Sequence, residues 1–140
     1  MNGPGNDMQR IKRLFGWLGL ICLLLIIPVK ATRFLSEATA ITLMVGIAPS
    51  LLGPAGLLFL ILSSSGRLSR LTLMQVTLLV GAVALGLEFV QLLPRPGILA
   101  YVYYTFDWLD VLASLVSVCL GYFIALFVTK MQVKHRDRAQ

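Results

Sequence analysis

Four long apolar stretches constrain the fold of this chain more than any other feature of its sequence. They cover about residues 14–31, 38–62, 71–93 and 107–129, and short connections join them. A helix that rises about 1.5 Å per residue crosses the roughly 30 Å hydrocarbon core of a bilayer with about 20 apolar residues. Because 58% of the 140 residues are hydrophobic and only 13% are charged, one soluble core cannot bury them. The sequence therefore predicts an integral membrane protein.

The four stretches predict helices rather than strands. None of them alternates apolar and polar residues as a half-buried strand does. A backbone in lipid must satisfy its own hydrogen bonds, and a helix does so within one segment. We expect an all-α fold, in which residues 1–140 form one membrane domain with basic tails at residues 1–13 and 130–140.

Basic residues flank the expected helices unevenly, and such residues accumulate on the cytoplasmic side of a membrane. One side carries Lys30, Arg33 and Arg95, which are offset by Glu37 and Asp107. The other side carries the remaining flanking cations: Arg10, Lys12, Arg13, Arg67, Arg70, Lys130, Lys134, Arg136 and Arg138. We expect both termini to face the cytoplasm. The net charge of +6 is spread over separate flanks instead of one folded face, which argues against a nucleic-acid partner.

The first stretch has two possible fates. Its basic start, short apolar run and downstream small residues (38–40) resemble a secretory signal. Lys30 and Arg33 directly after the apolar run, and the lack of a small-x-small cleavage site beside it, favour a helix that is retained. The orientation of the other three helices is the same in both cases.

Glycine and proline interrupt the second stretch, at Gly46, Pro49, Gly53, Pro54 and Gly56. Proline removes a backbone donor and clashes with the preceding turn, so we expect a kink near Pro49 or a break at Gly53–Pro54. A broken helix can line a site, as in transporters. The favoured interpretation is simple packing, because both residue types are common in membrane helices.

The third and fourth stretches each carry one stripe of small and polar residues at helical spacing. The stripe of the third holds Gly81, Ala84, Glu88, Gln91 and Arg95, and that of the fourth holds Asp107, Asp110, Ser114, Ser117 and Gly121. Matched stripes on two antiparallel neighbours predict that these helices face one another. Their polar halves then meet at the extracytoplasmic end. The expected binding cluster consists of Glu88, Gln91, Arg95, Asp107, Asp110 and Ser114.

The members of this cluster have competing explanations. A charge at membrane depth costs roughly 2.5 to 3.5 kcal/mol, so the deeply placed Glu88 is expected to have a partner or a function. Glu88 and Asp110 are the candidates for any catalytic role. Asp107 and Asp110 also have the spacing of helix-capping residues. Arg95 is either a site member or an interfacial cation, and Ser114 is more typical of helix packing than of a nucleophile.

No motif indicates a cofactor or a metal. The sequence has no nucleotide-binding glycine loop, no His or Cys set with metal-ligand spacing and no nucleophile elbow. Cys22 and Cys119 lie in different apolar stretches and are expected to be packing residues. We therefore expect neither a cofactor nor a bound metal.

Residues 80–125 resemble the VanZ-like family of small, multi-span bacterial membrane proteins. The resemblance rests on Glu88-x-x-Gln91 near the end of one helix and on Asp110 and Gly121 along one face of the next. The family pattern has an asparagine where this chain has Ser114 and a glycine where it has Ser117, and Arg95 lies farther from Asp110 than the family's arginine does. The resemblance implies a multi-pass protein of the bacterial plasma membrane, with no established biochemical activity.

Three functions are compatible with these patterns. The favoured one is a non-enzymatic cell-envelope protein whose extracytoplasmic cluster binds an envelope lipid or a membrane protein. That membrane protein is either a different chain or a second copy of this one. The second is an outer-leaflet enzyme that acts on a lipid-linked substrate, with Glu88 as acid or base. The third is a small proton-coupled transporter, in which intramembrane carboxylates and broken helices recur.

Overall fold

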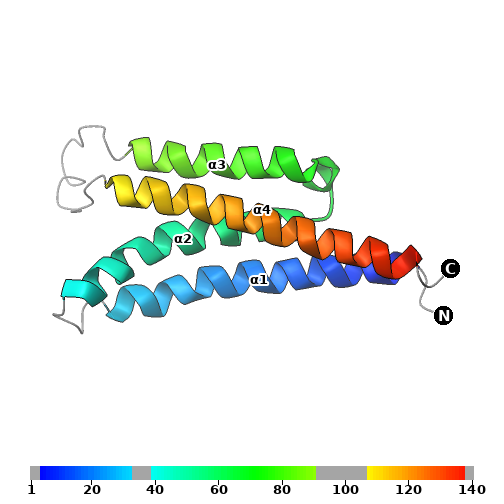
Figure 1. Ribbon diagram of the computed structural model, residues 1–140, viewed down its shortest axis with the longest axis horizontal. Coiled ribbons are helices and arrows are strands. Elements are labelled where there is room, and N and C mark those ends of the chain that lie inside the picture. Colours follow the sequence, from blue (N-terminus) through cyan, green and yellow to red (C-terminus); the bar gives the residue numbers. More distant parts are fainter. Residues whose placement is uncertain (1–3, 33–38, 91–106, 138–140) are drawn as a thin grey trace.

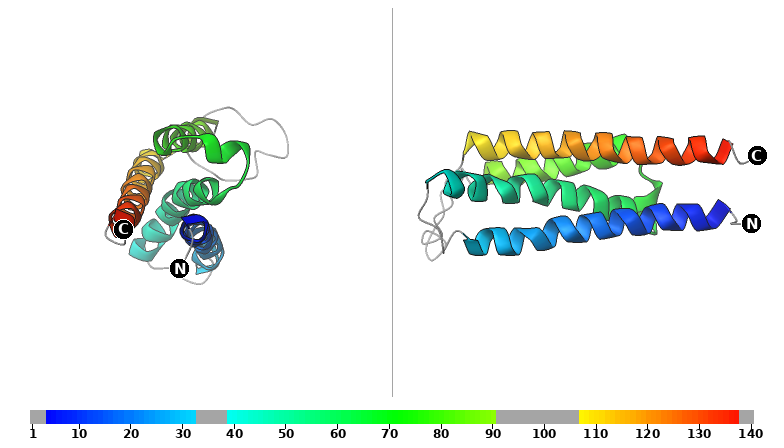
Figure 2. Two further views of the ribbon diagram at one scale, coloured as in Figure 1. Left: turned by 90° about the vertical axis from the view of Figure 1, so that its right-hand side faces the viewer. Right: turned by 60° about the horizontal axis from the view of Figure 1, so that its bottom comes forward.

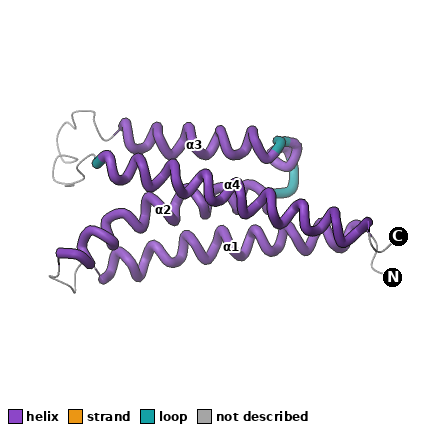
Figure 3. Tube along the Cα trace, in the orientation of Figure 1, coloured by secondary structure: helices purple, strands orange, loops and turns teal. Residues whose placement is uncertain are grey.

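The computed structural model describes residues 4–32, 39–90 and 107–137, and within these ranges the chain is helical with no strand. The elements are α1 (Pro4–Thr32), α2 (Thr39–Ser63), the short 3-10 helix η1 (Arg67–Arg70), α3 (Leu73–Val90) and α4 (Trp108–Asp137). All four α-helices contain a segment long and apolar enough to cross a membrane. Figure 3 shows how little of the described chain lies outside helices. The prediction of an all-α chain with four such helices is confirmed for these residues.

The helices run alternately up and down (Figure 1), and α2 occupies the centre. It contacts α1 on one side and both α3 and α4 on the other, and α3 also packs against α4 (Figure 2). The start of α1, η1 and the end of α4 lie together at one end of the bundle. This end therefore gathers the basic residues of three separate segments: Arg10, Lys12, Arg13, Arg67, Arg70 and Lys130. That these residues face the cytoplasm stays a prediction.

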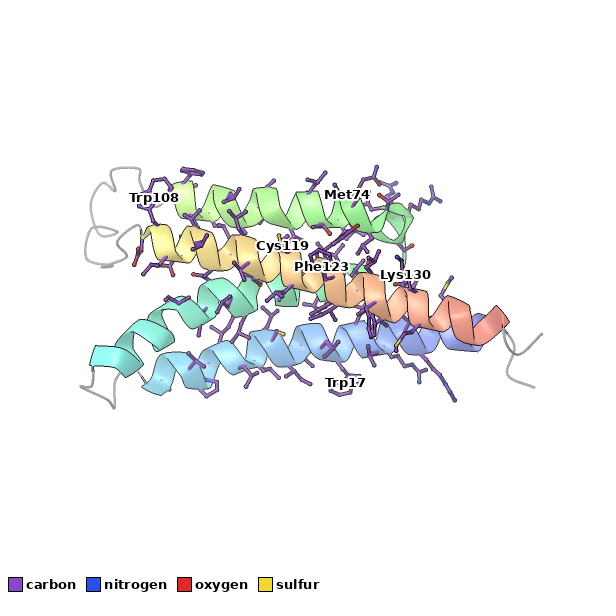
Figure 4. The ribbon with its side chains drawn as sticks, in the orientation of Figure 1. Trp17, Met74, Trp108, Cys119, Phe123 and Lys130 are labelled. Carbon is purple, nitrogen blue, oxygen red and sulfur yellow. The ribbon has the colours of Figure 1, made fainter. Side chains whose placement is uncertain are left out.

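The core lies where α2 meets its neighbours. Its buried members are Phe15, Leu58, Phe59, Val76, Val80, Val118 and Ala125. The rings of Phe15 and Phe59 stack with their centroids 5.8 Å apart. Large apolar side chains also cover the outside of the bundle. Trp17, which is labelled in Figure 4, is one of them. Such a surface suits lipid, because apolar side chains that contact hydrocarbon instead of water carry no free-energy cost of exposure.

Helix boundaries differ from the apolar stretches in identifiable ways. Helix α3 begins at Leu73 rather than at residue 71, because Thr72 and Gln75 form a reciprocal capping box. The Gln75 amide donates to Thr72 Oγ1 at 3.3 Å, and the Thr72 amide donates to Gln75 Oε1 at 2.9 Å. Helices α1 and α4 extend beyond the apolar runs into the polar tails.

Helix α2 runs through both Pro49 and Pro54 as one helix. The expected break at Gly53–Pro54 is thus absent, and a bend of the helix axis stays a prediction. Residues 91–106, which contain the end of the third apolar stretch, lie outside the described ranges.

Glycine lets α1 and α2 approach at the level of their backbones. A Cβ atom on Gly19 would lie 2.8 Å from the carbonyl oxygen of Gly56 and 2.9 Å from the amide nitrogen of Leu60. Both atoms belong to the α2 backbone, which cannot move aside as a flexible side chain can. We expect Gly19→Ala to separate the two helices and to lower the free energy of unfolding by about 1 to 3 kcal/mol. Thermal unfolding in detergent measures the change.

Gly86→Ala is the matched control for this substitution. Gly86 also lies within a helix, but a Cβ there would meet nothing within 4 Å. Equal losses of stability for Gly19→Ala and Gly86→Ala would contradict the close contact of α1 with α2.

The sidedness of the bundle predicts how single cysteines react. In a background without Cys22 and Cys119, a cysteine at Leu68 in η1 should react with a membrane-impermeant maleimide only from the cytoplasmic side. A cysteine at Tyr101, which lies in the sequence between α3 and α4, should react only from outside. Labelling of both positions from the same side would rule out this topology.

Candidate functional site

Glu88 is a buried acidic residue near the end of α3. It continues the inward face of that helix, in which Val76, Val80, Ala84 and Glu88 are buried at intervals of four residues. The side chain of Glu88 is only 7% exposed. Its Oε2 atom is buried and has no hydrogen-bond partner within the described ranges. A buried polar atom without a partner carries a cost that a native structure normally avoids.

Asp110 of α4 is the acidic neighbour of Glu88. It lies close enough for its charge to act on that of Glu88. The two helices pack against each other, and Gly81 of α3 lies opposite Val118 of α4, where a Cβ would meet Val118 Cγ1 at 4.0 Å, an ordinary contact distance. The structure thus brings together the two carboxylates that the stripe pattern singled out.

Asp110 also has a partner on α2, which the sequence did not suggest. The hydroxyl of Ser50 donates a hydrogen bond to Asp110 Oδ1 at 3.0 Å. One sequence signal for this role was available, because Ser50 is the one polar side chain between residues 46 and 62. The acidic site is therefore built from three helices rather than two.

Ser114 and Ser117 bond to a different helix from the expected one. Their stripe was assigned to the face of the third apolar helix, but both hydroxyls donate to backbone carbonyls of α2. Ser114 Oγ donates to Ser50 O at 3.2 Å, and Ser117 Oγ donates to Leu51 O. Ser117 Oγ also accepts a hydrogen bond from the amide of Ala55 at 3.1 Å. The stripe assignment was wrong for these serines because helical spacing defines a face but not the neighbour that covers it.

Gly121 extends the same contact with α2. A Cβ atom there would lie 2.8 Å from Leu58 Cδ2, and Leu58 is completely buried. The small residue allows α4 to lie close to α2 one turn beyond Ser117.

Asp107 is exposed and caps α4. Its Oδ1 accepts a hydrogen bond from the amide of Leu109 at 3.0 Å, and its carbonyl oxygen accepts one from the amide of Asp110 at 3.1 Å. Capping was one of the two explanations for this residue, and its exposure sets it apart from the buried Glu88. Gln91 and Arg95, the remaining predicted members, lie outside the described residues.

The described side chains support neither a metal centre nor a serine nucleophile. Residues 4–32, 39–90 and 107–137 contain no group of three or more His, Cys, Asp or Glu residues that could hold a metal ion. Cys22 and Cys119 are free thiols on different helices, and Figure 4 shows Cys119 on α4. The hydroxyls of Ser114 and Ser117 are engaged with the backbone of α2. A nucleophile needs a neighbouring base instead.

Comparison of the chain with models of protein families, with curated proteins and with solved structures found no match. The resemblance to the VanZ-like family thus stays a prediction from Glu88, Gln91, Asp110 and Gly121.

The capping role of Asp107 is testable by two substitutions. Asp107→Ala removes the side-chain acceptor and should lower the free energy of unfolding by about 1 kcal/mol. Asp107→Asn keeps an acceptor of the same shape and should be nearly neutral. Thermal unfolding of the purified protein measures both. A large loss in the asparagine variant would show that the charge, rather than the cap, is what matters at this position.

Proposed function

We propose that this chain is a multi-pass protein of the bacterial plasma membrane that binds the ammonium group of an envelope-lipid headgroup at the extracytoplasmic end of α3 and α4. Glu88 and Asp110 are the binding residues. The protein acts by binding rather than by catalysis. The observation that carries this proposal is the buried Oε2 of Glu88, which lacks a partner among the described residues beside a second carboxylate.

The charge of the site favours a cation. Two neighbouring carboxylates in a medium of low dielectric repel each other, and an opposite charge between them relieves this repulsion. Asp110 already accepts the Ser50 hydroxyl, whereas Glu88 Oε2 retains an unused acceptor. A ligand ammonium group offers both a positive charge and N–H donors.

The depth of the site favours a lipid headgroup. Asp110 is two residues from Trp108, the first residue of α4, and Glu88 lies beside Asp110 at the same end of the bundle. At about 1.5 Å per residue, the backbone of Asp110 lies about 3 Å from the start of α4. This is the level at which the hydrocarbon region gives way to headgroups. A VanZ-like multi-pass protein of the cell envelope would present such a site to the outer leaflet.

The same buried carboxylate supports proton-coupled transport as a second candidate. An ionisable side chain that faces the bundle interior is typical of proton relays, and Glu88 is buried rather than exposed on the surface of the bundle. An outer-leaflet enzyme receives less support, because the described hydroxyls beside the pair bond to Asp110 or to backbone.

Glu88→Gln tests the proposal. The protein is purified and placed in bilayers of phosphatidylglycerol with increasing phosphatidylethanolamine, and the bound phosphatidylethanolamine is counted by native mass spectrometry. Glutamine keeps the shape of the side chain but removes its charge. A charge-assisted hydrogen bond contributes about 1.5 to 3 kcal/mol, so retention of this lipid should fall about tenfold or more. Asp107→Asn removes an exposed charge from the same end and should leave retention unchanged.

Equal retention by wild type, Glu88→Gln and Asp107→Asn would refute the lipid site. Substrate-dependent proton flux that is present in wild-type vesicles and lost in Glu88→Gln would instead favour the transporter.

A further inference from the structure

We propose that Ser50 is a third residue of the lipid-binding site, and that Ser114 and Ser117 position it by supplying hydrogen bonds to α2 around Pro54. The binding part of this inference rests on the proposed function. The positioning part rests on hydrogen bonds between α2 and α4 and is independent of any ligand.

Pro54 creates a gap in the backbone hydrogen bonds of α2. In an α-helix each amide donates to the carbonyl four residues earlier, and proline has no amide hydrogen. The carbonyl of Ser50 therefore lacks its usual donor. Water is not available in the hydrocarbon region to replace it. Ser114 of α4 takes this place, since its hydroxyl donates to the Ser50 carbonyl at 3.2 Å.

Ser117 bridges the next pair along α2. The amide of Ala55 and the carbonyl of Leu51 are the partners that an ordinary helix joins directly. Ser117 Oγ accepts from Ala55 N at 3.1 Å and donates to Leu51 O. Two serines one turn apart on α4 thus serve consecutive carbonyls of α2.

These bonds hold Ser50 from two directions. Its carbonyl accepts the hydroxyl of Ser114, while its own hydroxyl donates to Asp110 Oδ1 at 3.0 Å. Asp110 and Ser114 lie one turn apart on α4, so both bonds hold Ser50 against a single face of that helix. The position of the Ser50 hydroxyl therefore depends on Ser114 as well as on Asp110.

The fixed position of Ser50 narrows the class of ligand that the proposed lipid-binding site can hold. A hydroxyl that donates to Asp110 still has an acceptor lone pair. Together with the carboxylates of Glu88 and Asp110, it offers acceptors from α2, α3 and α4. A primary ammonium group carries three N–H donors. The site accordingly selects a primary ammonium headgroup over a trimethylammonium headgroup, which has no N–H donor.

The positioning role is tested by combining Ser114→Ala with Pro54→Ala. Ser114→Ala alone leaves the Ser50 carbonyl without a donor, and the melting temperature should fall by about 4 °C. Pro54→Ala restores an amide at position 54, so that Ser114→Ala in this background should cost much less. The double variant should also recover the phosphatidylethanolamine retention that Ser114→Ala loses. Ser63→Ala, which removes a hydroxyl bonded within α2 to Leu60, serves as the control for both measurements.

The binding role is tested by Ser50→Ala in the same bilayers. Loss of one neutral hydrogen bond, about 1 kcal/mol, should lower phosphatidylethanolamine retention about fivefold, whereas Ser63→Ala should not change it. Phosphatidylcholine should be retained less than phosphatidylethanolamine by the wild type and should not respond to Ser50→Ala.

The outcomes separate the two claims. If Glu88→Gln lowers retention and Ser50→Ala does not, the lipid site stands and the role of Ser50 in binding is overturned. If Glu88→Gln has no effect on retention, the proposed function fails, and the role of Ser50 in binding fails with it. An equal cost of Ser114→Ala with and without Pro54 overturns the positioning role whatever the lipid result.

Discussion

The hydrogen-bonding requirement of a backbone in lipid governs the arrangement of this bundle. Pro54 leaves the Ser50 carbonyl without an amide donor, and no water reaches the hydrocarbon region to replace it. Ser114 supplies the missing bond from α4, and Ser117 bridges the next pair. These contacts fix α4 along α2, with Gly121 packed against Leu58 one turn farther on. A proline in the central helix thereby sets the position of the helix that carries Asp110.

The acidic pair follows from this arrangement. With α4 held on α2, Asp110 bonds to Ser50 and lies close enough to α3 for its charge to act on Glu88, which continues a buried row of apolar residues. The result is a polar site in an otherwise apolar bundle, with one carboxylate partly satisfied and the other retaining a buried acceptor. A buried acceptor without a donor is costly unless a ligand or a proton binds to it. The functional proposal therefore rests on this site rather than on the fold.

The sequence predicted the elements well and the neighbours of each helix less well. Run length and hydropathy were enough for four membrane-length helices, because lipid imposes one simple requirement on a spanning segment. Helical spacing also placed Glu88 and Asp110 on inward faces. It did not reveal that Ser114 and Ser117 face α2, since a periodic pattern defines a face but not its partner. From the sequence, we interpreted Pro54 as a packing feature. The carbonyl that loses its donor at Pro54 lies four residues earlier and belongs to Ser50, so the sequence did contain a signal for this residue.

We infer that Glu88 and Asp110 share one site, and a carbon–carbon correlation in lipid bilayers measures this directly. The sequence contains few acidic residues, only six Asp and Glu in total, so carboxyl-labelled glutamate and aspartate give a solid-state NMR spectrum that is simple to assign. We expect a cross peak between the carboxyl carbons of Glu88 and Asp110 that disappears in Asp110→Asn. A spectrum without that cross peak, or one in which the peak persists in Asp110→Asn, would contradict the shared site.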